Sequence, residues 1–137
     1  EEFEKDKNTV SLSGPYHYYD LPFFSNFFAE VSWWLSAPLA YQIVGYTLLA
    51  GNFVVKKQTL LDIGGFDPNV MFYGDDTDIG RKLSAFGKVK FHMNFWIYTS
   101  GRRLEKNGLF KTFFLYGMNF LWEVIFKKPF TESDETT

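Results

Sequence analysis

Apolar residues recur at three- and four-residue spacing in two long stretches of the chain, which places them on one face of a helix. The first stretch covers residues 23–43 and the second covers Leu109–Phe126. Pro38 is expected to kink or split the first helix, because proline lacks a donor N–H and crowds the preceding turn. Gly45 is expected to end the first helix, and Pro129 to stop the second.

Shorter patterns predict the elements around these two helices. Residues 76–86 form an amphipathic pattern in which Ile79, Leu83 and Phe86 face inward. Alternation and β-forming residues predict strands over residues 9–12, 46–55, 88–92 and 95–98, with a short helix over residues 56–63, loops over residues 16–22, 66–74 and 100–107, and a frayed lead-in over residues 1–8. This order predicts an α/β fold with a short mixed sheet, flanking helices and a C-terminal amphipathic helix.

Two explanations account for residues 31–55, which contain no charged side chain. The segment is long enough to cross a bilayer, which takes about 20 apolar residues. A buried helix followed by a buried strand shows the same lack of charge, and this is the interpretation that we favour.

The C-terminal pattern, Leu109–Phe126, carries Lys111 and Glu123 as its only charges. One interpretation is a helix docked on the core of the domain. The other, which we favour, is a helix lying in a membrane interface, with lysines at the lipid headgroups. These lysines are Lys106, Lys111, Lys127 and Lys128. We therefore divide the chain into residues 1–104, a membrane-associated helix over residues 105–130, and a disordered acidic tail over residues 131–137.

Composition narrows the classes of protein. The chain has 137 residues, which suffices for one domain with a core. Aromatic residues make up 21%, with 17 Phe, which indicates a large packing surface, a membrane-facing surface, or both. The net charge of −2 argues against nucleic-acid binding, and the lack of cysteine excludes disulfides and thiolate metal sites.

Three carboxylates, Asp75, Asp76 and Asp78, fall within four residues at the predicted start of the 76–86 helix. Helix capping explains one of them, because an acid there accepts hydrogen bonds from free N–H groups and suits the helix dipole. Three acids repel one another, so capping explains only part of the cluster. Carboxylates also bind hard cations, but the spacing does not fit a calcium loop.

Residues 50–91 resemble the second half of the catalytic domain of family 2 glycosyltransferases. The matching motifs occur in order, and the likeness extends over residues 10–104. These motifs are Gly51-Asn52-Phe53, Gly64-Gly65-Phe66-Asp67, the acid pair Asp75-Asp76, and Asp78-Ile79. Asp75 departs from the family, where Glu is commoner at this position. The resemblance implies the acceptor-side half of a GT-A fold, which is Rossmann-like.

The resemblance also implies roles for individual residues. Asp76 corresponds to the general base of inverting sugar transfer, which takes the proton of the acceptor hydroxyl. Supporting contacts to the base or to the acceptor are expected from Asp75, Asp78, Gly51 and Asn52. A basic segment after the base helix often closes over the donor, so Arg102 or Arg103 is a candidate for diphosphate binding. A solvated basic turn explains these arginines equally well.

Cofactor and partners follow from the same resemblance. The full-length enzyme is expected to use a nucleotide-sugar donor and Mg²⁺ or Mn²⁺, held mainly by an N-terminal half that precedes these residues, so the present chain alone is expected to be inactive. The acceptor is expected to carry a hydroxyl and to be lipid-linked, at the cytoplasmic face of the plasma membrane. The rival interpretation is a non-catalytic, membrane-associated interaction module whose acids cap a helix.

Overall fold

A computed structural model describes residues 2–49, 51–66 and 75–126, apart from the side chains of Asp75 and Glu123. The predictions for most of the 66–74 loop, for Pro129 and for the acidic tail fall outside this part of the chain. Within it, the predicted α/β class is confirmed, as a small mixed sheet of three strands flanked by helices.

The three-stranded sheet is built around strand β1 (Thr9–Ser13). Strand β3 (Phe53–Val55) runs antiparallel to one side of it, with Leu12 opposite Val54. Strand β4 (Lys88–Phe91) runs parallel to the other side. A separate pair joins β2 (Tyr16–Tyr18) in parallel to β5 (Ile97–Thr99). The predicted loop over residues 16–22 is therefore wrong at its start, and the predicted 46–55 strand is shortened to β3.

All five residues of β1 are buried, including its polar ones. Ser11 Oγ donates to the Val54 carbonyl at 3.0 Å, and Ser13 Oγ donates to the Asn52 carbonyl at 2.9 Å. Ser13 Oγ also accepts the Leu49 N–H at 2.9 Å. These bonds satisfy the hydroxyls of Ser11 and Ser13, which would otherwise be costly to bury, whereas the buried Thr9 hydroxyl has no hydrogen-bond partner among the described residues.

The helices agree with the sequence patterns in most places. Helix α2 (Phe23–Val44) continues through Pro38 without being split, and ends at Gly45, whose φ of 78° suits glycine. The other predicted helices appear as α3 (Lys57–Asp62), α4 (Asp75–Ser84) and α6 (Leu109–Phe126).

Two short helices were not predicted. The lead-in contains α1 (Glu2–Lys5), and the predicted loop over residues 100–107 contains α5 (Arg102–Asn107). Before α5, the Asp20 carboxylate accepts hydrogen bonds from the Gly101 N–H and the Ser100 hydroxyl. The start of α5 is thus fixed by a residue about 80 positions away, which local sequence patterns do not reveal.

The main core lies between the sheet and α4. Its buried residues are Val10, Tyr46, Leu48, Ile79, Leu83 and Val89. Ile79 and Leu83 face inward as predicted, whereas Phe86 is 55% exposed and the prediction for it is wrong. A second cluster of Tyr18, Ala29 and Leu104 joins β2, α2 and α5.

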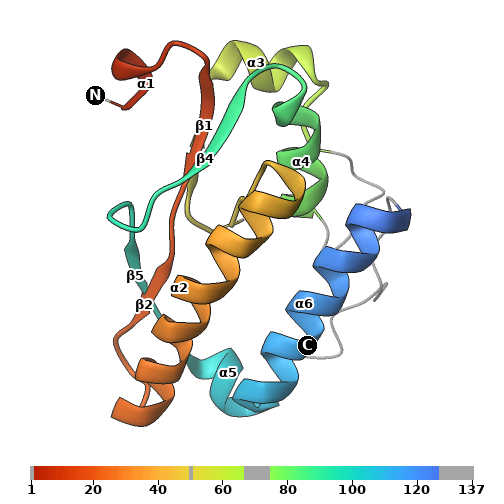
Figure 1. The fold of residues 1–137 in the computed structure, drawn as a ribbon. Helices are drawn as coiled ribbons and strands as arrows, with labels where there is room; N and C mark the ends of the chain where they lie inside the picture. The colour runs from red at the N-terminus through yellow and green to blue at the C-terminus, as the bar shows by residue number, and fades with distance from the viewer. Residues whose placement is uncertain (1, 50, 67–74, 127–137) are drawn as a thin grey trace.

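Helices α2 and α6 lie side by side on one side of the strands (Figure 1). The prediction of a buried helix within residues 31–55 is wrong, because the only fully buried residues of α2 are Ala29 and Ala37. Nor is this segment a single spanning helix, since it is divided between α2 and β3. In the described part of the chain, α6 alone has the length and composition to cross a membrane.

Candidate functional site

The acidic cluster lies at the beginning of α4, where the helix leaves its first N–H groups without helical partners. Asp76 is half-buried, and its Oδ1 accepts the Thr77 N–H at 2.8 Å and contacts Thr77 Oγ1 at 3.4 Å. Asp76 therefore satisfies one backbone donor of the first turn, as the capping interpretation requires.

Asp78, two residues further along α4, has a different environment. Its side chain is 6% exposed and forms ion pairs with Arg81 and with Lys82, whose Nζ is 2.6 Å from Oδ2. Two cations thus neutralise this carboxylate. Both ion pairs lie within α4, so Asp78 stabilises the helix locally, and Arg81 and Lys82 are half-buried.

The Tyr16 hydroxyl is contacted by one of the predicted site residues and influenced electrostatically by two others. The Gly51 N–H donates to it at 2.9 Å. Burial raises the pKa of Tyr16, the Gly51 hydrogen bond lowers it, a negative charge on Asp76 raises it, and the positive charge of Arg103 lowers it. Asp76 and Arg103 therefore lie within electrostatic reach of the same oxygen, although they come from α4 and α5.

Gly51 lies so close to Tyr16 that a larger residue would require the tyrosine side chain to shift. A Cβ added there would lie 2.6 Å from the Tyr16 hydroxyl, which is closer than real Cβ contacts. The motif glycine thus allows the backbone to reach the tyrosine. Tyr16 itself was missed by the sequence analysis, which placed it in a loop; its pairing with β5 is set by residues far away in the chain.

Asn52, the other residue of the motif, is buried at 4% exposure. Its side-chain amide donates to the carbonyls of Gly14, Pro15 and Phe95, at 3.0, 3.3 and 2.7 Å. These bonds hold the end of β1 against the segment that leads into β5. The structure therefore gives Asn52 a structural role next to the site.

The two candidate arginines act on different residues. Arg103 acts on Tyr16, as described above. Arg102 is exposed, and its positive charge lowers the pKa of Asp20, after the larger effects of the hydrogen bonds from Ser100 and Gly101. Only Arg103 is thus grouped with Asp76. The Asp75 side chain, predicted to support the base, lies outside the described part of the structure.

An open groove of about 270 Å³ lies on the α2 side of Tyr16. Besides Tyr16 it is lined by Trp33, Trp34 and the His17–Glu30 pair, whose Nδ1 and Oε1 atoms are 2.9 Å apart. Asp76 is not one of its lining residues, so this groove and the acidic helix start are different features that share Tyr16.

A divalent cation does not fit the described residues. Among them, no group of three or more histidine, aspartate or glutamate side chains is placed to hold a metal ion. Asp78 is already paired with two cations, which disfavours it as a metal ligand. We therefore derive no step through a metal ion from these residues.

Comparison of the chain with models of protein families, with curated proteins and with solved structures found no match. Only the geometry above and the sequence resemblance therefore bear on the function.

Proposed function

We propose that the chain is the acceptor-side half of an inverting, nucleotide-sugar-dependent glycosyltransferase, with Asp76 as its general base. The observation that supports this most is that the charges of Asp76 and Arg103 both act on the Tyr16 hydroxyl, to which the Gly51 N–H donates. A carboxylate and a guanidinium whose charges both reach one hydroxyl suit a reaction that moves a proton and releases an anion.

In the proposed reaction, the acceptor oxygen attacks the anomeric carbon of the donor. Its proton passes to the Asp76 carboxylate as the new C–O bond forms, because a neutral alcohol is a poor nucleophile. The bond between the anomeric carbon and the diphosphate breaks on the opposite side, and the bonding electrons leave with the diphosphate. Attack from the opposite side inverts the configuration.

The neighbours of Asp76 have supporting roles in this scheme. Arg103 provides a forked, charged donor for the departing diphosphate. The Tyr16 hydroxyl keeps its proton at neutral pH, as tyrosine does, and in this scheme acts as a hydrogen-bond donor towards an oxygen of the acceptor or donor. Asp75 would lie next to the base at the start of α4.

Replacing Asp76 by Asn in the full-length enzyme tests the proposal. We expect the release of nucleoside diphosphate, measured with a panel of nucleotide sugars and membrane lipid extract as acceptor, to fall by about 10²–10⁴-fold, the usual worth of a general base. Asp62→Asn is the matched control, because Asp62 is exposed at the end of α3, where its carboxylate accepts a hydrogen bond from Gln58. An unchanged rate in Asp76→Asn would remove the base role.

A second candidate function is supported by the apolar side chains that α2 and α6 expose. In this alternative the chain is a non-catalytic, membrane-associated interaction module, and Asp76 only caps α4. The two functions differ in the expected effect of Asp76→Asn: the module keeps its binding and has no transfer activity to lose.

A further inference from the structure

Helix α2 turns most of its large side chains away from the molecule. The buried positions of this 22-residue helix are Ala29 and Ala37. Large apolar residues are exposed instead, with Phe24 at 82% and Trp34 at 65%. The exposed row includes Phe23, Phe24, Phe27, Trp34, Leu39 and Ile43. A water-exposed helix normally shows the opposite arrangement.

Helix α6 also buries polar side chains and exposes large apolar ones, and we call both helices inverted in this sense. Its buried residues include Thr112 and Asn119, at 2% and 0% exposure, while Phe110 and Phe114 are 72% and 66% exposed. Thr112 Oγ1 donates to the Gly108 carbonyl and Asn119 Nδ2 donates to the Leu115 carbonyl, each at 2.9 Å. Two polar side chains of α6, Thr112 and Asn119, therefore face the protein, while several large apolar ones are exposed.

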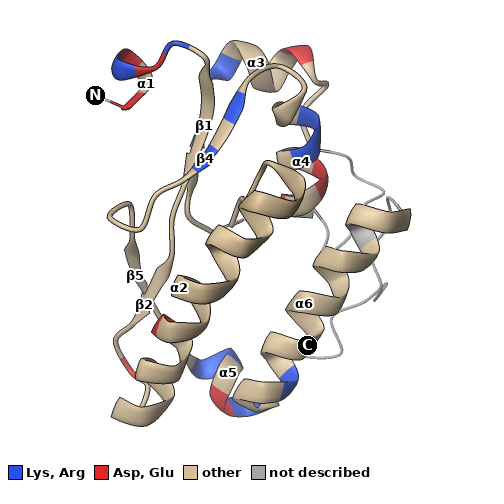
Figure 2. Ribbon diagram, in the orientation of Figure 1, with Lys and Arg blue, Asp and Glu red and all other residues tan. Residues whose placement is uncertain are grey.

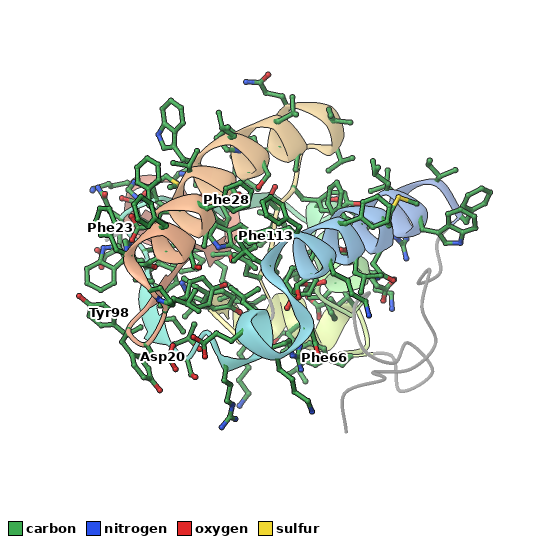
Figure 3. The ribbon with its side chains drawn as sticks, turned by 90° about the horizontal axis from the view of Figure 1, so that it is seen from below. Asp20, Phe23, Phe28, Phe66, Tyr98 and Phe113 are labelled. Carbon is green, nitrogen blue, oxygen red and sulfur yellow. The ribbon has the colours of Figure 1, made fainter. Side chains whose placement is uncertain are left out.

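The two inverted helices form one continuous surface. The rings of Phe28 and Phe113 lie between them, with centroids 6.1 Å apart (Figure 3). Figure 2 shows almost no charge on this layer, whereas α5 and the start of α6 carry several basic residues together with the acidic Glu105. Arg102, Lys106 and Lys111 are exposed along that edge. We call the outward surfaces of α2 and α6, together with this edge, the apolar layer.

We propose that the apolar layer is a lipid-binding face, which lies in the interface of an anionic bilayer with both helices parallel to the membrane plane. An uncharged aromatic surface fits the boundary of the acyl chains, and the basic edge fits the anionic headgroups. Hydroxyls on the layer also bond within their own helix, as when Ser32 Oγ donates to the Phe28 carbonyl at 2.8 Å. A bilayer demands such internal bonding, because its interior offers no water to bond with.

This proposal extends the expectation for the C-terminal helix to a second helix, α2, that the sequence analysis placed in the core. It does not depend on the transfer reaction, because vesicle binding is measured without donor or acceptor. The competing occupant is a second copy of the chain. A dimer would cover the apolar side chains, but it would not account for the basic residues along the edge.

Vesicle co-sedimentation with matched leucine variants tests the lipid-binding face. Leu35 on α2 and Leu121 on α6 are 58% and 49% exposed, and Leu61 on α3 is 62% exposed away from the layer. We expect Leu35→Ser and Leu121→Ser each to weaken partitioning into phosphatidylcholine–phosphatidylglycerol vesicles by about five- to tenfold, from the loss of buried apolar area. Leu61→Ser should bind like the wild type, and pure phosphatidylcholine should bind less.

Equal binding of all three leucine variants would overturn the proposal. So would a failure of the wild type to bind vesicles while forming a dimer that Leu35→Ser dissociates, which would favour the second copy.

A fluorescence measurement that starts from the wild-type chain guards against leucine variants that fail to fold. Brominated lipids should quench the tryptophan fluorescence of the wild-type chain, and Trp34→Phe should reduce that quenching, because Trp34 lies on the exposed side of α2. Absence of quenching, or quenching that Trp34→Phe does not reduce, would show that α2 stays out of the lipid and would overturn the two-helix face.

Discussion

At the residue scale, the candidate site depends on how Tyr16 is surrounded. Its hydroxyl is fixed by the Gly51 N–H, and charges on Asp76 and Arg103 act on it with opposite signs. The acids, Gly51 and the arginines were recognised from sequence motifs. Tyr16 was not, because a tyrosine within an aromatic stretch gives no local sign that a carboxylate and a guanidinium will be brought to it.

Charge substitutions should shift the ionisation of Tyr16 in opposite directions. Asp76→Asn removes a charge that raises the pKa of Tyr16, so the pKa should fall. Arg103→Gln removes a charge that lowers it, so the pKa should rise. Alkaline difference absorbance, with Tyr16→Phe to identify the transition, measures both shifts. Identical Tyr16 titrations in both variants would contradict the electrostatic effect of Asp76 and Arg103 on Tyr16.

Loss of the Asn52 amide should destabilise the fold more than loss of an exposed one. Asn52→Ala leaves the carbonyls of Gly14, Pro15 and Phe95 without this donor, at an expected cost of about 3 kcal/mol in the free energy of unfolding. Asn52→Asp should cost more, because a carboxylate would face carbonyl oxygens. Urea denaturation measures these changes, and exposed Asn94→Ala is the control. Equal midpoints for Asn52→Ala and Asn94→Ala would refute the structural role.

At the element scale, the sequence predicted the long helices well and the environment of their faces poorly. Periodicity showed that residues 23–43 and Leu109–Phe126 form helices with apolar faces, and both are confirmed. Periodicity does not say what covers such a face, and the choice of a buried helix for α2 was wrong. Short elements such as β2 and α5 were missed because strand pairing and the Asp20 contacts, rather than local propensity, determine them.

The junction between the N-terminal segment and β4 makes a pH-dependent prediction. Asp6 Oδ2 contacts Lys88 Nζ at 2.9 Å and Lys90 Nζ at 3.3 Å. The Lys88 hydrogen bond, opposed in part by desolvation, lowers the pKa of Asp6 from 3.8 to about 2. Since the folded pKa is below the ordinary value, the stabilisation is present above a pH of 3.8 and is lost as the pH falls through about 2.

Asp6→Asn tests this junction. The variant should be less stable than the wild type at neutral pH, by an amount that salt reduces because the pair is exposed. The difference should vanish on acidification through the same pH range. Thermal unfolding at a series of pH values measures it, and a difference that stays constant down to the most acidic pH would contradict the ion-pair explanation.

At the scale of the whole molecule, the mixed α/β class was predictable from the order of strand and helix patterns, and it is confirmed. The arrangement that brings α4, β2 and α5 together around Tyr16 was not, because it depends on pairings between segments far apart in sequence. The same is true of the apolar layer, which arises only when α2 and α6 lie side by side. The proposed site and the proposed lipid-binding face thus both result from the tertiary fold.

The configuration of the first-formed product tests the central claim most directly. Nuclear magnetic resonance of the sugar that the full-length enzyme transfers reports the anomeric configuration, and comparison with Asp76→Asn shows whether that carboxylate is needed. We predict inversion in the wild type and loss of the product in Asp76→Asn, because one displacement assisted by one base inverts the anomeric carbon. Retention of configuration, or undiminished transfer by Asp76→Asn, would contradict the proposed role of Asp76.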